Sequence, residues 1–287
     1  MLIDYHSHTW RCRHAHGAME QYVQRAIALG FSEFGFSDHS PWMIQARGEH
    51  VAMAPEELPD YVADVQALRR RFNSDQFTLR LGLEMDYVPS RRAIARRAIE
   101  QFPWDYLIGS VHHLGFWGLP KPSHAHFFET ARIEDVCELY YHLVGEMIDE
   151  GFCDIIAHLD LPGKFGHFPP GGMVPYVEPL IPRMLARGTA VEINTSGVDA
   201  PCAEVQPGWD VLALLAEAHV PLLVNSDAHQ PEHIGRHFPE TLSRLRDLGV
   251  RTLTRFEARR RIEYPLPEPG EIARLERALQ SPQADLG

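Results

Sequence analysis

Histidine and carboxylate residues follow the ends of several apolar runs in this sequence. The first group is Asp4-Tyr5-His6-Ser7-His8, and the last is Asn225-Ser226-Asp227-Ala228-His229. In extended backbone, residues two positions apart point to the same side, so His6 and His8 can both reach one cation. Imidazole and carboxylate groups bind Zn²⁺ and related divalent metals. The spacing therefore predicts a metal site with ligands from both ends of the chain.

Seven apolar runs of strand length alternate with longer segments of helical period, the pattern of βα units around a parallel sheet. One helix is marked by apolar residues at steps of three and four from Leu58 to Phe72, and another by similar steps from Ile133 to Met147. The sequence therefore predicts an α/β barrel of parallel strands. The predicted strands are residues 2–5, 33–37, 78–84, 106–110, 155–157, 190–194 and 222–225.

Each predicted strand carries ionisable residues on it or just beyond its end. In barrels of parallel strands the active site lies at the C-terminal mouth, so we expect these side chains to converge on one cavity. They are His6, His8, Asp38, His39, Glu84, His112, His113, His158, Glu192, Asp227 and His229.

Two of these positions allow a finer prediction. Glu84 closes an apolar run, and a carboxylate that faces several imidazoles is suited to bridge two cations. Of the neighbours His112 and His113, we expect His112 to be the ligand, because it shares a strand face with Ser110. His113 then packs in the barrel wall or lines the substrate cleft.

The ordered set of motifs resembles the polymerase-and-histidinol-phosphatase (PHP) superfamily and, within it, the monofunctional histidinol-phosphate phosphatases. The resemblance extends from residue 4 to about residue 235. The motifs are His6-Ser7-His8, Cys12-Arg13-His14-Ala15, Phe36-Ser37-Asp38-His39-Ser40-Pro41, Gly82-Leu83-Glu84, Gly109-Ser110-Val111-His112, Ala157-His158-Leu159-Asp160, Glu192-Ile193-Asn194-Thr195-Ser196-Gly197 and Asn225-Ser226-Asp227-Ala228-His229.

The resemblance implies a distorted (β/α)₇ TIM-like barrel, the PHP fold, that holds three divalent metal ions (Zn, Fe or Mn). The implied activity is hydrolysis of L-histidinol phosphate to L-histidinol and phosphate in histidine biosynthesis, the alternative being another small phosphomonoester or a nucleotide. His16 is an alternative to His14 as a ligand. The implied ligands are His6, His8, Glu84 and Asp227 for one metal, Glu84, His112 and His158 for the second, and His14, His39 and His229 for the third.

Other polar residues are candidates for catalysis and for substrate binding. The candidate catalytic groups are Glu84, Asp227, His229 and Asp38, with Asp38, His113 and His126 as unranked donors of the proton that the leaving alcohol needs. Glu192 either binds a substrate amine or supports a metal ligand. Residues 117–128 are expected to form a loop near the mouth, either a lid or a surface excursion. The remaining substrate-binding candidates are Lys164, Arg11, Arg13, Arg236, Asn194, Thr195 and Ser196.

Composition limits the class of protein. The 287 residues suit one domain that spans residues 1–287, with a short helical extension from about residue 265. The net charge of -12 argues against nucleic-acid and membrane partners. The resemblance implies a small-molecule phosphomonoester as the partner. Four scattered cysteines, no signal segment and no long apolar run predict a cytoplasmic protein. The sequence leaves the oligomeric state open.

Overall fold

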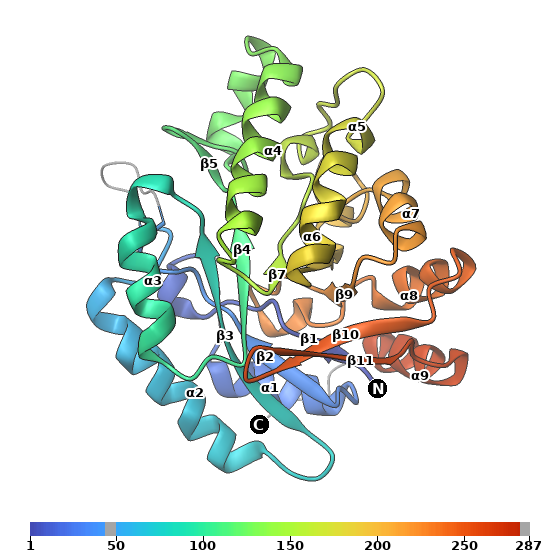
Figure 1. Cartoon of the computed structure of the whole chain (residues 1–287). Coiled ribbons are helices and arrows are strands. Elements are labelled where there is room, and N and C mark those ends of the chain that lie inside the picture. The colour runs from blue at the N-terminus through green and yellow to red at the C-terminus, as the bar shows by residue number, and fades with distance from the viewer. Residues whose placement is uncertain (44–49, 282–287) are drawn as a thin grey trace.

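The computed structural model describes residues 1–43 and 50–281. Seven parallel strands form one sheet in the order β1-β2-β3-β4-β7-β8-β9, surrounded by helices (Figure 1). All seven predicted strands are present, which confirms the α/β barrel. The strands are β1 (Ile3–Asp4), β2 (Glu33–Phe36), β3 (Thr78–Asp86), β4 (Tyr106–Ser110), β7 (Ile155–Ile156), β8 (Ala190–Asn194) and β9 (Leu222–Asn225).

The barrel nearly closes where the segments after β1 and β9 meet. Ser7 pairs with Ala228 in a parallel bridge, and the backbone N–H of Tyr5 donates to the side chain of Asn225 at 2.8 Å. Because these contacts join the first and last strands of the sheet, the metal motifs at the two ends of the sequence become neighbours.

The helices bury the apolar faces that the sequence predicts. In α2, Leu58, Val62, Val65 and Leu68 are buried, as expected for residues spaced at the helical period. The α-helices are α1 (Met19–Ala28), α2 (Leu58–Phe72), α3 (Arg92–Gln101), α4 (Ile133–Asp149), α5 (Val174–Val177), α6 (Ile181–Arg187), α7 (Trp209–Glu217), α8 (Phe238–Asp247) and α9 (Pro269–Gln280). The last of them is the predicted C-terminal helix.

The side chain of Tyr106 lies buried inside the barrel. A Cβ atom at Gly82 would lie 2.3 Å from the Tyr106 ring, so this position must be glycine for the ring to fit. The Tyr106 hydroxyl donates to the backbone carbonyls of Tyr5 at 2.5 Å and Phe36 at 3.1 Å. The Tyr106 ring therefore packs inside the barrel as part of its core, as side chains do in barrels of this kind.

An antiparallel hairpin that the sequence analysis did not predict covers the N-terminal end of the barrel. It consists of β10 (Thr252–Glu257) and β11 (Arg260–Pro265). Arg255 of this hairpin lies 3.0 Å from Glu33 at the start of β2, and Arg259 contacts Asp154, just before β7, at 2.9 and 3.0 Å. These ion pairs hold the hairpin at the N-terminal end of the barrel, so the hairpin does not cover the C-terminal mouth.

Residues 117–128, expected to form a loop, contain regular structure. Strands β5 (His113–Leu114) and β6 (Trp117–Gly118) form a small hairpin, and a 3₁₀ helix η4 (Pro122–Glu129) follows. The expectation of a loop was therefore wrong for most of this segment. Within residues 1–43 and 50–281, no helix combines the length and apolarity needed to cross a membrane.

Candidate metal centre

Glu84 on β3 lies at the centre of the histidines that the barrel brings together. Its Oε2 atom is 2.6 Å from His39 Nδ1, 3.5 Å from His6 Nε2 and 3.7 Å from His8 Nε2. The side chain is fully buried. One carboxylate oxygen therefore faces imidazoles that follow β1 and β2.

The other oxygen of Glu84 faces a different pair of histidines. Its Oε1 atom lies 3.3 Å from His112 Nε2, after β4, and 3.4 Å from His158 Nε2, after β7. The donor atoms of these three residues lie within 4.8 Å of one another. Two oxygens that face separate imidazole groups form the arrangement expected of a carboxylate that bridges two cations.

Asp227, after β9, completes a second group with His6 and His8. Its Oδ1 atom is 3.1 Å from His8 Nε2 and 3.6 Å from His6 Nε2. Asp227 has a φ of 50° and His158 a φ of 23°, values in the left-handed region that residues other than glycine rarely adopt. Such backbone strain is concentrated at functional sites, where it directs a side chain into the site.

A third group contains His14, His39 and His229, whose donor atoms also lie within 4.8 Å of one another. The Nε2 atoms of His14 and His229 are 3.0 Å apart. Among the described residues, no group of this kind includes His16, which donates its backbone N–H to the carbonyl of His229 at 2.7 Å. The geometry thus favours His14 over His16 as the ligand.

The donor atoms are better arranged to bind metal ions than to form hydrogen bonds with one another. His6 Nε2, His39 Nδ1 and Glu84 Oε2 are buried and have no hydrogen-bond partner. His39 Nδ1 and Glu84 Oε2 are 2.6 Å apart, but they lack the alignment of a hydrogen bond. Buried polar atoms are costly when unpaired, and lone pairs that converge on a shared point are what a cation requires.

The electrostatics of the cluster favour charged side chains. Burial acts to raise the pKa of Glu84, but the charges of His39, His112 and His6 hold it well below its usual range. Burial lowers the pKa of His112, but Glu84 and Asp86 outweigh this effect and raise it to about 10. Without a cation, Glu84 and His112 therefore stabilise each other's charged forms, and a bound cation would take the place of the His112 proton.

The pKa shifts of His8 and His39 follow the same physics. Burial lowers the pKa of His8, yet hydrogen bonds to Asp227 and Asp38 raise it to about 9. His39 is buried beside other imidazoles, and burial lowers its pKa to about 4 although Glu84 opposes the shift. His39 is thus ready to coordinate without the loss of a proton.

Three carboxylates lie behind the histidines and orient them. Glu192 Oε2 is 2.7 Å from His6 Nδ1, Asp38 Oδ1 is 3.5 Å from His8 Nδ1, and Asp86 Oδ1 is 3.4 Å from His112 Nδ1. Carboxylates in this position fix the tautomer and the ring orientation of a ligand. The structure therefore places Glu192 beneath His6, and not in contact with a substrate amine.

Asp38 is also buried behind the metal-site histidines and does not line the cavity described below. It accepts hydrogen bonds from the backbone N–H groups of Thr9 at 3.2 Å and His39 at 2.9 Å. This position supports the orientation of His8 and gives no direct path to a leaving alcohol.

A cavity of about 560 Å³ opens above the metal-site residues. Of the other candidate residues, Lys164, Ser196, His113 and Arg236 line it. Pro120 and Pro122 also line it, so part of the segment predicted near the mouth does lie there. A cavity of this size suits a small molecule.

The lining residues differ in how they are held. Arg236 donates to the backbone carbonyls of Ser226 at 2.9 Å and Asp227 at 3.0 Å, and it pairs with Asp199 at 3.2 Å, so it braces the loop that carries Asp227. Among residues 1–43 and 50–281, no carboxylate lies within 4.0 Å of the Lys164 ammonium. Within the described residues, the Lys164 ammonium therefore has no ion pair that would hold it away from a bound anion.

Five other candidates do not line the cavity. Arg11 pairs with Asp64 at 2.6 Å, Arg13 pairs with Glu57, and His126 is bound to the carbonyl of Ser123 at 2.9 Å on the surface. Asn194 and Thr195 are fully buried, and Asn194 donates to Asp227 at 3.2 Å. The structure therefore does not bring these residues to the wall of the cavity.

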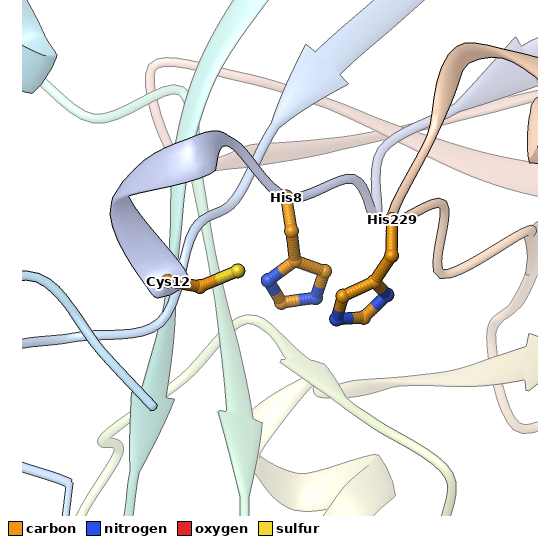
Figure 2. Close-up of side chains that lie close together, drawn as sticks. All are labelled: His8, Cys12 and His229. Atoms are coloured by element: carbon orange, nitrogen blue, oxygen red, sulfur yellow. The ribbon is translucent and has the colours of Figure 1, made fainter. Parts of the chain in front are cut away.

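Two residues of the site were missed in the sequence. Asp86 follows Glu84 by two positions on β3, so the alternation of side chains along a strand could have placed both at the mouth. Cys12 lies near His8 and His229 and forms a further group of potential metal ligands with them (Figure 2). In the sequence, only its place in the motif before His14 indicated that it lies near the site.

Comparisons with known proteins agree with this geometry. Residues 4–196 match the family model of the PHP domain. The chain is 38% identical over 253 residues to a probable histidinol-phosphatase of Deinococcus radiodurans, which covers 88% of this chain and 96% of that protein. The chain belongs to the PHP domain family. This PHP-domain protein is also 27% identical over 266 residues to a histidinol-phosphatase of Bacillus subtilis, covering 84% of this chain and 98% of that one.

Solved structures support the fold of this PHP-domain protein. The crystal structure of histidinol phosphate phosphatase from Lactococcus lactis, in complex with zinc, L-histidinol and phosphate, aligns with a TM-score of 0.78 and 20% identity. The alignment covers 91% of this chain and 98% of that chain. The predicted (β/α)₇ TIM-like barrel is therefore confirmed.

Proposed function

We propose that this PHP-domain protein is a metal-dependent phosphomonoesterase that hydrolyses L-histidinol phosphate to L-histidinol and phosphate, a step of histidine biosynthesis. The observation that carries the proposal is the carboxylate of Glu84, whose two oxygens face separate imidazole groups at the base of the cavity. Relatives described as histidinol-phosphatases support the choice of substrate.

Three divalent cations, Zn, Fe or Mn, are proposed to occupy the three groups of donor atoms. The first group is His6, His8, Glu84 and Asp227, the second is Glu84, His112 and His158, and the third is His14, His39 and His229. When bound, such cations lower the pKa of a bound water and neutralise charge on a phosphoryl group. Nitrogen and oxygen donors without a structural thiolate cluster favour catalytic over purely structural metal binding.

The chain's own residues bind and position the phosphoester. Lys164 offers an ammonium to the phosphate oxygens, because it lines the cavity without a carboxylate partner of its own. Ser196 lines the cavity beside Asp227, 3.4 Å from it, and supplies a hydroxyl at the same wall. His113 lines the cavity on the side of β4, which supports a contact with the alcohol portion of the substrate.

The charge of the protein is compatible with an anionic substrate. The net charge is -12, but the proposed cations make the base of the cavity locally positive. We propose that the whole chain works as one catalytic unit. The free state of all four cysteines supports a reducing compartment, the cytoplasm.

The test is phosphate release from L-histidinol phosphate, measured beside nucleoside monophosphates and simple sugar phosphates after the metal content is known. We expect the highest kcat/KM for L-histidinol phosphate and loss of turnover with a chelator. Equal or better turnover of a nucleotide or another small phosphomonoester would reassign the substrate. Full turnover in metal-free protein would refute the metal-dependent mechanism.

A further inference from the structure

Gln206 is a buried polar residue that lies outside the proposed metal ligands. It follows the 3₁₀ helix η7 (Thr195–Asp199) after β8, and only 3% of it is exposed. Its backbone N–H donates to the carbonyl of Asn194 at 2.9 Å, and its own carbonyl accepts from the N–H of Asn194 at 2.7 Å. The side chain of Gln206 lines the cavity above the metal-site residues. Its Nε2 atom is buried and has no hydrogen-bond partner.

The carboxyl group of Asp160 sets the direction of the Gln206 amide. Its Oδ2 atom accepts a hydrogen bond from the backbone N–H of Gly208 at 2.7 Å, which fixes Asp160 beside the segment that carries Gln206. The Gln206 amide approaches this carboxyl, and the Oδ1 atom of Asp160 is buried without a partner. An ionised carboxylate only accepts hydrogen bonds, so it attracts the NH₂ end of an amide. The Oε1 atom of Gln206 is therefore left to face the cavity.

The wall of the cavity near Gln206 has apolar side chains. Leu161 and Phe165, which follow β7, line the cavity. The backbone N–H of Cys202, in the loop that leads to Gln206, donates to the carbonyl of Lys164 at 3.0 Å, so the two segments lie side by side. Apolar walls with a few placed polar groups are typical of small-molecule sites. A single neutral acceptor in such a wall suits a ring N–H better than an ammonium group, which costs more to remove from water.

We propose that Gln206 determines the substrate specificity of the site by accepting a hydrogen bond from a ring N–H in the alcohol portion of the phosphoester. This proposal rests on the phosphatase function proposed above and names the group that the site selects. Leu161 and Phe165 pack against the ring, and Asp160 is a positioning residue that holds the amide. A ring of similar size without an N–H leaves the Gln206 oxygen unpaired, and it therefore binds more weakly.

The test measures the binding of two free alcohols, so it needs no turnover. L-Histidinol and L-phenylalaninol carry the same amine and hydroxyl groups, and only the ring of L-histidinol has an N–H. Calorimetric titration of the zinc-loaded, full-length protein in the presence of inorganic phosphate gives both dissociation constants. We expect the wild type to bind L-histidinol about 10-fold more tightly than L-phenylalaninol, as expected for one acceptor left unpaired.

Gln206→Met removes the amide and keeps the length of the side chain. It should bind L-histidinol about 10-fold more weakly, with the binding of L-phenylalaninol unchanged. Gln206→Asn is a smaller change that withdraws the amide from the cavity, and it should also lose the preference if the methionine variant does not fold. Gln24→Met is the matched control, because Gln24 on α1 contacts Glu20 at 3.1 Å and does not line the cavity. It should keep the preference of the wild type.

Two results would overturn the proposal. One is a wild type that binds both alcohols equally well, and the other is a folded Gln206 variant that keeps the preference for L-histidinol. Phosphate release is assayed separately. A protein that hydrolyses L-histidinol phosphate without this preference refutes the role of Gln206 alone, whereas a protein with the preference and no phosphate release refutes only the phosphatase function.

Discussion

Substitution of Glu192 by glutamine tests how the barrel orients its metal-site histidines. Each oxygen of Glu192 accepts two hydrogen bonds. Oε2 accepts from His6 Nδ1 at 2.7 Å and from Asn225 at 2.8 Å, while Oε1 accepts from Asn194 at 2.9 Å and from the His158 backbone at 3.3 Å. All four neighbours are donors, so the NH₂ group of glutamine must face two of them in either orientation.

The expected loss of stability follows from the number of donors that lose their acceptor. Two buried donors lose their acceptor, at about 1–3 kcal/mol each, so the free energy of unfolding should fall by about 2–6 kcal/mol. In either orientation, a residue that carries a proposed metal ligand, His6 or His158, is disturbed. Loss of such a supporting hydrogen bond lowers metal affinity by about 10–100-fold.

Two measurements separate stability from metal binding. Denaturant unfolding in the presence of a chelator gives the free energy, and competition with a zinc-binding dye gives the Zn²⁺ affinity of the folded protein. Glu33→Gln is the matched control, since Glu33 is a buried carboxylate at the opposite end of the barrel that contacts Arg80 at 2.9 Å. The control should lose stability and keep its Zn²⁺ affinity. A Glu192→Gln protein with wild-type Zn²⁺ affinity would refute the orienting role.

Three further predictions concern ligands, substrate and pH. Glu84→Ala should lose more than one cation per chain and abolish turnover, and full metal content by elemental analysis would contradict the bridging role. Lys164→Ala should raise KM for the phosphoester with metal content unchanged, whereas unaltered kinetics would remove Lys164 from the substrate site. In cation-free protein the pKa of His8 is raised to about 9 and that of His112 to about 10, so both carry protons at neutral pH. Metal binding must release these protons, so the affinity for the metal should fall as the pH decreases from about 8 to about 6. Calorimetry of metal binding in buffers of different protonation enthalpy measures the protons released, and a finding of no release would refute this prediction.

The strands of the barrel could be predicted because each is a short apolar run buried on both faces, which parallel sheets require. The β10–β11 hairpin was missed for a physical reason. Its turn consists of Ala258 and Arg259, which have φ values of 48° and 61°. Tight hairpin turns of this kind usually carry asparagine or glycine, so the sequence contains no recognisable turn signal.

The metal-site histidines could be predicted because position after a parallel strand fixes where a side chain lies. The cationic candidates could not be placed in this way. Arg11 turns to Asp64 and Arg13 to Glu57, partners 53 and 44 residues away in the sequence. The direction of a long side chain depends on such distant partners, which composition and spacing do not reveal.

The central claim is that side chains from all around the barrel bind cations in one centre linked by Glu84. Anomalous X-ray diffraction from crystals of the zinc-loaded protein tests it most directly. We predict three anomalous peaks, one at each proposed ligand group, with two of them sharing the carboxylate of Glu84. The absence of any zinc peak at Glu84, or of peaks within reach of His6, His158 and Asp227, would contradict the account.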